Sequence, residues 1–165
     1  MAARIRGLAR DGPDDTGEPA SRASPGEPRE VFLRANRNTR HQQRSARAAS
    51  PDYDPRRERC WIAEKDGENV GSVFLVKHPE QEGVAKLRLV LVKPHARGLG
   101  IGRRLVQECT RFALQAGYRK ITLRTNSVLV AVRRIYEKEG YRLVHSEPHH
   151  SFGHDLVRET WELEL

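Results

Sequence analysis

Short runs of alternating hydrophobic and polar residues in the middle of the chain predict a β-hairpin followed by a third strand. Residues 60–64 and 70–76 are rich in β-branched and aromatic side chains, which favour strands. Lys65-Asp66-Gly67-Glu68 joins them, and Asp-Gly is typical of a tight turn because that turn needs positive φ angles. Residues 84–92 alternate leucines with other residues. Pro94 ends this third strand because proline cannot donate to the ladder.

The spacing of apolar residues then changes to that of a helix. They recur at three- and four-residue steps on one face of residues 101–116, at Ile101, Leu105, Cys109, Phe112 and Ala116. Gly117 is a natural helix terminator, and Cys109 is expected to be a core residue. Strand 120–125, a second helix from about Val128 to Gly140, and strands 141–145 and 158–165 follow. This order predicts an α/β fold built on a mixed sheet.

The first 52 residues differ in composition from the rest. Residues 11–29 are rich in Pro, Gly, Ser and acids, and residues 31–47 carry five arginines and no acid. A helix in this segment would have no apolar face with which to dock, so we predict a disordered Pro/Arg-rich segment over 1–52 and one folded domain over 53–165. The alternative interpretation is a basic arm that contacts nucleic acid.

Bulk properties narrow the protein class. No run of 18 apolar residues is present and the N-terminus has no apolar signal region, so we expect neither a membrane span nor secretion. Two cysteines make no disulfide framework, which predicts a reduced, cytoplasmic setting. The net charge of +8 fits either nucleic-acid or membrane-surface binding, or a pocket for a polyanionic ligand.

The segment between the third strand and the first helix carries the strongest chemical signal. It reads Arg97-Gly98-Leu99-Gly100-Ile101-Gly102, and small residues before a helix N-terminus form a cradle for phosphate groups. Arg97 and Arg103 would add charge at its rim. A Walker A loop needs Lys-Ser or Lys-Thr, and a dinucleotide fingerprint needs a third glycine where Arg103 stands. On the glycines alone, an ordinary turn between strand and helix stays an alternative.

Two segments resemble signatures of the GNAT N-acetyltransferase family. Residues 89–105 resemble its acetyl-CoA motif, whose core is Arg/Gln-x-x-Gly-x-Gly/Ala. About forty residues on, Ile135-Tyr136-Glu137-Lys138-Glu139-Gly140-Tyr141 is similar to the second signature, Leu-Tyr-Glu-Lys-x-Gly-Phe. From about Asp54 to Asp155 the chain most resembles the GNAT halves of MarR-type regulator fusions, although no winged-helix sequence precedes it.

The resemblance implies a GNAT fold and transfer of an acetyl group from acetyl-CoA to a primary amine. It implies that the backbone of Leu91 and Val92 pairs with the pantetheine arm, and that Tyr136 protonates the leaving thiolate. Asn126 is a candidate partner for the pantetheine, although the family's usual Asn lies where Leu129 stands. The pyrophosphate would be bound by Arg97, Gly98, Leu99, Gly100, Ile101, Gly102 and Arg103.

The chain also departs from the family pattern. The family's usual strand glutamate is replaced by Lys86, so the general base is undefined, with Glu64, His145, Glu147 and His150 as candidates. The usual N-terminal strand and two helices are expected to be missing or replaced. These departures favour, as the alternative function, an impaired CoA-binding sensor. Three histidines near residue 150 lack a supporting carboxylate cluster, so we expect no metal. A homodimer is left open.

Overall fold

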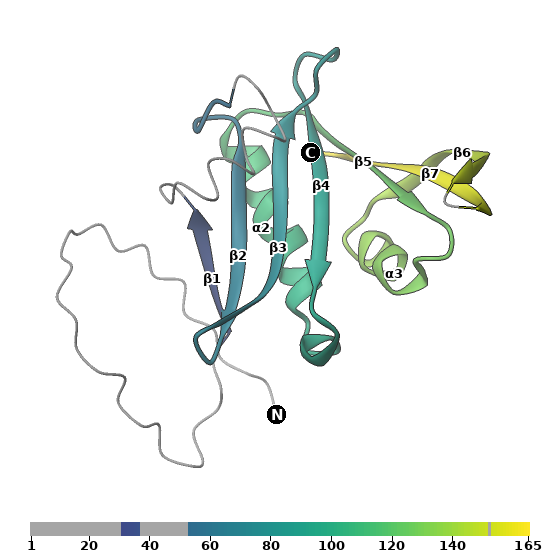
Figure 1. The fold of residues 1–165 in the computed structure, drawn as a ribbon. Helices are drawn as coiled ribbons and strands as arrows, with labels where there is room; N and C mark the ends of the chain where they lie inside the picture. The colour runs from purple at the N-terminus through teal and green to yellow at the C-terminus, as the bar shows by residue number, and fades with distance from the viewer. Residues whose placement is uncertain (1–30, 37–52, 152) are drawn as a thin grey trace, which may run out of the picture.

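In a computed structural model, residues 31–36, 53–151 and 153–165 are described. Their elements follow one another in the order strand, hairpin, strand, helix, strand, helix, hairpin (Figure 1). The bounds are β1 Val31–Asn36, β2 Arg59–Lys65, β3 Glu68–Lys77, β4 Val84–Val92, η1 Pro94–Ala96, α2 Ile101–Gln115, β5 Lys120–Asn126, α3 Val130–Lys138, β6 Arg142–Ser151 and β7 His154–Glu164. The predicted α/β order is confirmed.

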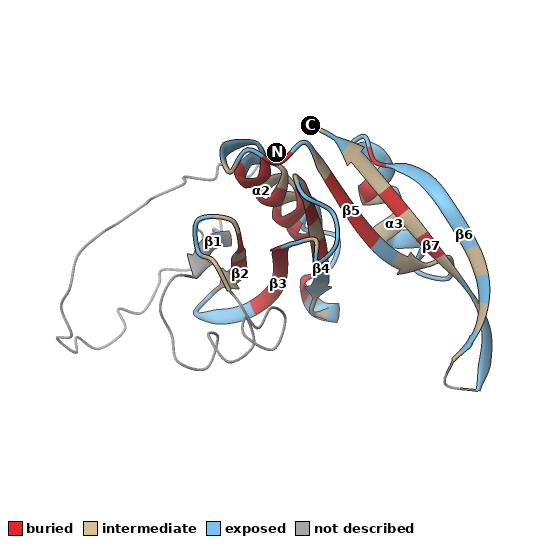
Figure 2. Cartoon of the chain, turned by 90° about the horizontal axis from the view of Figure 1, so that it is seen from above, coloured by how far each residue is buried: buried red, intermediate tan, exposed pale blue. Residues whose placement is uncertain are grey.

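The described strands form one mixed sheet in the order β1-β2-β3-β4-β5-β7-β6. Only β4 and β5 are parallel, and every other neighbouring pair is antiparallel. Helix α2 packs against β2, β3, β4 and β5, and its buried side is visible in Figure 2. This is a mixed α/β architecture with two described α-helices.

The turn between β2 and β3 has the geometry that its residues predict. Asp66 and Gly67 have φ angles of 54° and 77°, as a two-residue hairpin of this type requires. Helix α2 likewise ends where the glycine was expected to end it. Gly117 has φ 75°, a left-handed conformation that terminates a helix without the steric cost of a side chain.

Residues 31–36 form a strand, so the prediction of disorder is wrong for this part of the N-terminal segment. Strand β1 pairs antiparallel with β2 from Val31 opposite Lys65 to Asn36 opposite Cys60. Val31 and Leu33 pack against the main core. This burial and the ladder hydrogen bonds outweigh the polar surroundings of the run. The structure thus supplies an N-terminal strand that was expected to be missing or replaced. Residues 1–30 and 37–52 lie outside the described part.

The main core lies between the sheet and its helices. Leu75, Leu105, Ile121 and Leu123 are at most 1% exposed, and the rings of Trp61 and Phe112 meet edge to face at 5.6 Å. Cys109 is fully buried among them, as predicted. Cys60 belongs to a smaller apolar cluster with Phe74, Tyr53 and Ile62. No described helix is long and apolar enough to cross a membrane.

Candidate active site

The two parallel strands separate halfway along their length. They pair only from Val84 opposite Lys120 to Leu87 opposite Leu123, although β4 continues to Val92 and β5 to Asn126. Leu89 has φ 54°, and the register of β4 against β3 shifts nearby, between Ser72 and Phe74. Such a bulge bends a strand. The strands therefore diverge beyond this point (Figure 1).

A cavity of about 680 Å³ lies on the helix side of the diverging strands. Its walls are mainly apolar and come from the end of β4, the glycine loop and α3. Its lining is Val90, Val92, Ala96, Arg97, Gly98, Gly100, Ile101, Gly102, Arg103, Val128, Leu129, Val130, Ala131, Val132, Arg134, Ile135 and Lys138. Val128, Leu129 and Val130 are 62%, 50% and 49% exposed. An apolar ligand segment would cover surface that is now open to water.

The glycine loop ends at the bare N-terminus of α2. Gly98 and Gly100 have φ angles of 80° and 75°, which residues with side chains rarely adopt. Gly100 is the N-cap, no side chain caps the helix, and no acid lies in its first turn. The first-turn N–H groups and the helix dipole thus present a positive end to the cavity. A Cβ added at either glycine would meet no atom within 4 Å, so the space above the loop is free for a ligand.

Basic side chains surround this end of the cavity. Arg97, Arg103, Arg134 and Lys138 are in its lining. Arg97 Nε donates to the carbonyl of Val92 at 3.3 Å. Arg103 forms an ion pair with Glu139, whose Oε1 also accepts from Gln107. The charge balance favours a ligand with several negative groups.

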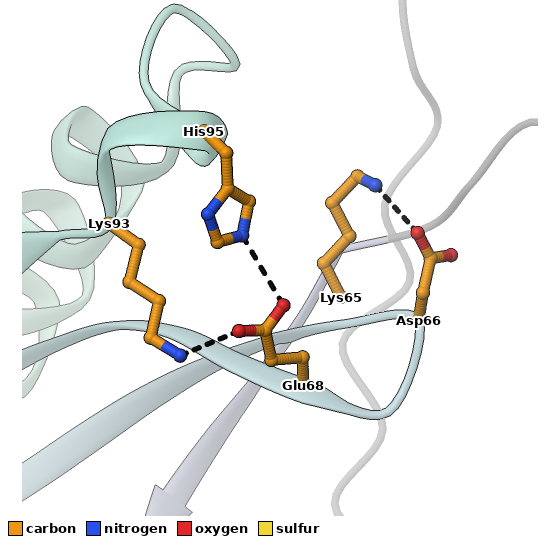
Figure 3. Close-up of polar contacts among 5 residues, drawn as sticks. All are labelled: Lys65, Asp66, Glu68, Lys93 and His95. Carbon is orange, nitrogen blue, oxygen red and sulfur yellow. Dashed lines mark hydrogen bonds and ion pairs between the residues drawn. The ribbon is translucent and has the colours of Figure 1, made fainter.

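A carboxylate on the hairpin ties the loop to the rest of the sheet. Glu68 pairs with Lys93 at 2.6 Å and with His95 at 3.3 Å, while Lys65 pairs with Asp66 in the turn at 2.6 Å (Figure 3). The hydrogen bond and charge of Lys93 lower the pKa of Glu68. Exposed pairs of this kind add little stability.

The structure gathers most of the predicted loop residues at the cavity. Val92, Arg97, Gly98, Gly100, Ile101, Gly102 and Arg103 are in the lining, whereas Leu91, Leu99, Asn126 and Tyr136 are not. Asn126 stands three positions after the core residue Leu123 on β5. Because successive side chains of a strand point to opposite faces, the side chain of Asn126 lies on the sheet face away from the helices. The apolar wall over residues 128–132 was missed as a site. Its signal is a run of apolar residues longer than one face of a helix requires.

Tyr136 lies on the core side of α3. It is 4% exposed, with its ring 5.7 Å from that of Tyr141 and 6.4 Å from that of Trp161. Burial raises its pKa, so the phenol stays protonated at neutral pH. Behind it, buried Glu159 accepts from Trp161 Nε1 at 3.0 Å and pairs with Arg133 at 2.9 Å. This network fixes α3 against β7.

The four candidate bases are spread over the sheet. Glu64 lies on β2 and is paired across the ladder with Phe32 and Asn69, well away from the cavity. His150 binds Asp155 at 2.8 Å near the tip of the last hairpin. His145 and Glu147 are 3.6 Å apart on β6, and hydrogen bonds from Arg158 and His145 lower the pKa of Glu147. No cluster of potential metal ligands is found in the described residues.

These features define a class of protein. A mixed sheet with a diverging parallel pair, an apolar cavity behind it and an uncapped helix N-terminus at one end fits an elongated ligand with phosphates at one end. The model of the acetyltransferase (GNAT) family matches residues 27–141. The chain belongs to this family.

Individual relatives agree with the assignment. N-acetylaspartate synthetase of Xenopus tropicalis is 33% identical over 90 residues, which are 54% of this chain and 33% of that protein. Mycothiol acetyltransferase of Cellulomonas flavigena is 29% identical over 133 residues, covering 71% and 38% of the two chains. The chain thus spans about a third of the length of these curated relatives.

Solved structures share the fold. The yncA protein of Salmonella typhimurium, determined with its cofactor acetyl-CoA, superposes with a TM-score of 0.68 at 16% identity, covering 81% of this chain and 93% of that one. The ribosomal-protein-alanine N-acetyltransferase of Brucella melitensis gives a TM-score of 0.63 at 22% identity, covering 76% of each.

Proposed function

We propose that this protein is an N-acetyltransferase that moves the acetyl group of acetyl-CoA to a primary amine. The observation that carries the proposal is the uncapped N-terminus of α2, which opens after Gly98 and Gly100 onto an apolar cavity. The pyrophosphate of acetyl-CoA would meet the loop and Arg103, and its pantetheine arm would meet the apolar wall. Structures in the same fold carry acetyl-CoA, which supports this choice of donor.

Under this proposal the thioester lies where β4 and β5 separate. The backbone of Leu91 and Val92 orients the pantetheine arm along the free end of β4. The amine nitrogen attacks the carbonyl carbon, the carbon–sulfur bond breaks, and the departing thiolate takes a proton from Tyr136. Tyr136 does not line the cavity. The proposal therefore requires that the thioester end of the ligand enters more deeply than the cavity, where the sulfur meets the Tyr136 hydroxyl.

The proton lost by the amine goes to a group on the other side of the sheet. Trp161 on β7 faces the core, so the adjacent residue Thr160 faces the opposite side of the sheet. His145 is in register with Thr160, and Glu147, two positions later on β6, faces the same side. The base in this proposal is His145, with Glu147 beside it, and it acts through a chain of waters because β7 lies between β6 and β5.

The names of relatives do not agree on an acceptor. They include N-acetylaspartate synthetase, mycothiol acetyltransferase and ribosomal-protein-alanine N-acetyltransferase, so the donor half of the reaction is the shared part. The proposal also includes a likeness to the GNAT half of MarR-type regulator fusions and a cytoplasmic location. It leaves a homodimer open.

Release of free CoA thiol tests the proposal directly. The protein is incubated with acetyl-CoA and a panel of primary amines, and thiol release is followed with a disulfide reagent against a reaction without amine. We expect amine-dependent release and, by calorimetry, acetyl-CoA binding. Binding without release for any amine would contradict the enzyme and favour a CoA-binding sensor.

A further inference from the structure

Three basic side chains lie on the sheet face opposite the helices. Ala85 and Leu87 on β4 and Ile121 and Leu123 on β5 belong to the helix-side core. Successive side chains of a strand point to opposite faces. The intervening residues Lys86, Arg88 and Arg124 therefore face away from α2 and α3. We call these three residues the basic triad.

The basic triad borders the point where the two strands separate. Leu87 opposite Leu123 is the last paired position of β4 and β5. Arg88 and Arg124 are the next residues along each strand, and Lys86, opposite Thr122, lies one position before. The positive charges thus flank the entrance to the gap between the strands, on the side away from the proposed acetyl-CoA cavity.

Two members of the triad, Lys86 and Arg124, lie close enough for their charges to interact. The pKa of Lys86 is lowered by burial first and then by the charges of Arg124 and Arg88, while the charge of Glu80 acts in the opposite direction. Elsewhere on this face Glu162 is bound by Lys120 at 2.8 Å, and Glu147 by Arg158 at 3.1 Å. Within the described residues, Lys86 and Arg124 form no ion pair. Like charges held together in this way are stabilised by an anion placed between them.

Within the described part of the chain, the gap between β4 and β5 is open to an acceptor on one face of the sheet. The helix side of the gap is closed by α2 and α3 and would hold the donor, so the amine enters from the face that carries the triad. We propose that the acceptor is an amine that also bears an anionic oxygen group, a carboxylate or a phosphate, and that the basic triad binds this group while the amine enters the gap. Arginine suits the task because its planar guanidinium binds such groups through two parallel hydrogen bonds. This inference rests on the proposed acetyl transfer.

Matched pairs of amines test the charge requirement. Glycine is compared with glycinamide, β-alanine with β-alaninamide, and O-phosphoethanolamine with ethanolamine, each at saturating acetyl-CoA. We expect kcat/KM to be about 10- to 100-fold higher for the anionic member of at least one pair, as charge-assisted hydrogen bonds of this strength imply. The first two pairs report on a carboxylate and the third on a phosphate. Equal or better use of the neutral members would overturn the inference.

Variants of Arg124 connect the preference to the triad. Arg124→Gln should raise the KM of the preferred anionic amine about tenfold or more, leave the KM of acetyl-CoA unchanged, and have little effect on the neutral partner; Arg124→Lys should restore part of the preference. The control is Arg111→Gln, an exposed position on α2, which should change none of these values. An unchanged preference in Arg124→Gln would refute the role of the triad.

A binding measurement separates this inference from the proposed function. Saturation-transfer NMR with CoA present reports binding of each amine without turnover. If no amine releases CoA thiol but the anionic amines still bind in an Arg124-dependent way, acetyl transfer is contradicted and the anion site stands. If amines are acetylated and neither binding nor kinetics depends on their charge, the transferase stands and the anion site fails.

Discussion

Two glycines at opposite ends of α2 offer a matched test of the phosphate loop. Gly100 and Gly117 both have φ 75°, and a Cβ at either would meet no atom within 4 Å. Gly100 lines the cavity, and Gly117 does not. Gly100→Ala and Gly117→Ala should therefore destabilise the fold equally, and only Gly100→Ala should weaken acetyl-CoA binding.

The size of each effect follows from the geometry. Because neither Cβ clashes, the cost to stability is only that of an alanine in the left-handed region, about 1–2 kcal/mol. Alanine also restricts the unfolded chain, which returns about 0.4–1 kcal/mol. The net loss of about 1 kcal/mol corresponds to roughly 3–5 °C in Tm for a domain of this size. At Gly100 the methyl group also occupies the space proposed for the pyrophosphate. Loss of one charge-assisted hydrogen bond, about 1.5–3 kcal/mol, weakens binding about 10- to 100-fold.

Thermal unfolding and calorimetry measure the two effects separately. The parent and both variants are melted without ligand, and each is then titrated with acetyl-CoA at a temperature where all are folded. We expect two similar Tm losses and one loss of affinity. If the two variants bind acetyl-CoA equally well, the N-terminus of α2 does not hold the pyrophosphate.

Three further outcomes are expected. Tyr136→Phe should lower kcat about 10- to 100-fold and leave acetyl-CoA affinity unchanged, since general-acid help acts only in the transition state; unchanged turnover would make Tyr136 a packing residue. Removing residues 1–26, which are poor in apolar side chains, should leave Tm unchanged. Removing residues 1–36 should lower Tm by several degrees because β1 is lost. Equal Tm values for the two truncated proteins would mean that β1 adds no stability. Burial raises the pKa of Cys60 to about 11, so the thiol stays protonated at pH 8. Iodoacetamide should therefore modify Cys60 only in denaturant, and rapid labelling of the folded protein would contradict the burial of this thiol.

Local patterns predicted the elements that carry their own signals. The Asp66-Gly67 turn, the face of α2 and its end at Gly117 were all read correctly because each depends on residues close in sequence. Strand β1 was missed because its partner β2 lies more than twenty residues further along the chain. A six-residue run in polar surroundings gives little evidence of such pairing.

The candidate site shows the same division. The loop from Arg97 to Gly102 was predicted because its glycines and the helix start are contiguous. The wall over residues 128–132 and the basic triad were not predicted, since they depend on where β4 and β5 stop pairing. Leu89, whose positive φ angle accompanies that change, is an ordinary member of an alternating strand in the sequence.

The place of β7 in the sheet bears on how the chain folds during synthesis. This strand follows β6 in the chain but lies between β5 and β6, and the N–H of Leu165 is bound by the carbonyl of Arg119 at 2.9 Å. At roughly 5–20 residues per second, about 2–8 s pass between the synthesis of β5 and that of β7. During that interval one edge of β5 presents unpaired backbone groups, which invite pairing with another chain. A nascent or truncated chain without β7 should therefore aggregate through β5.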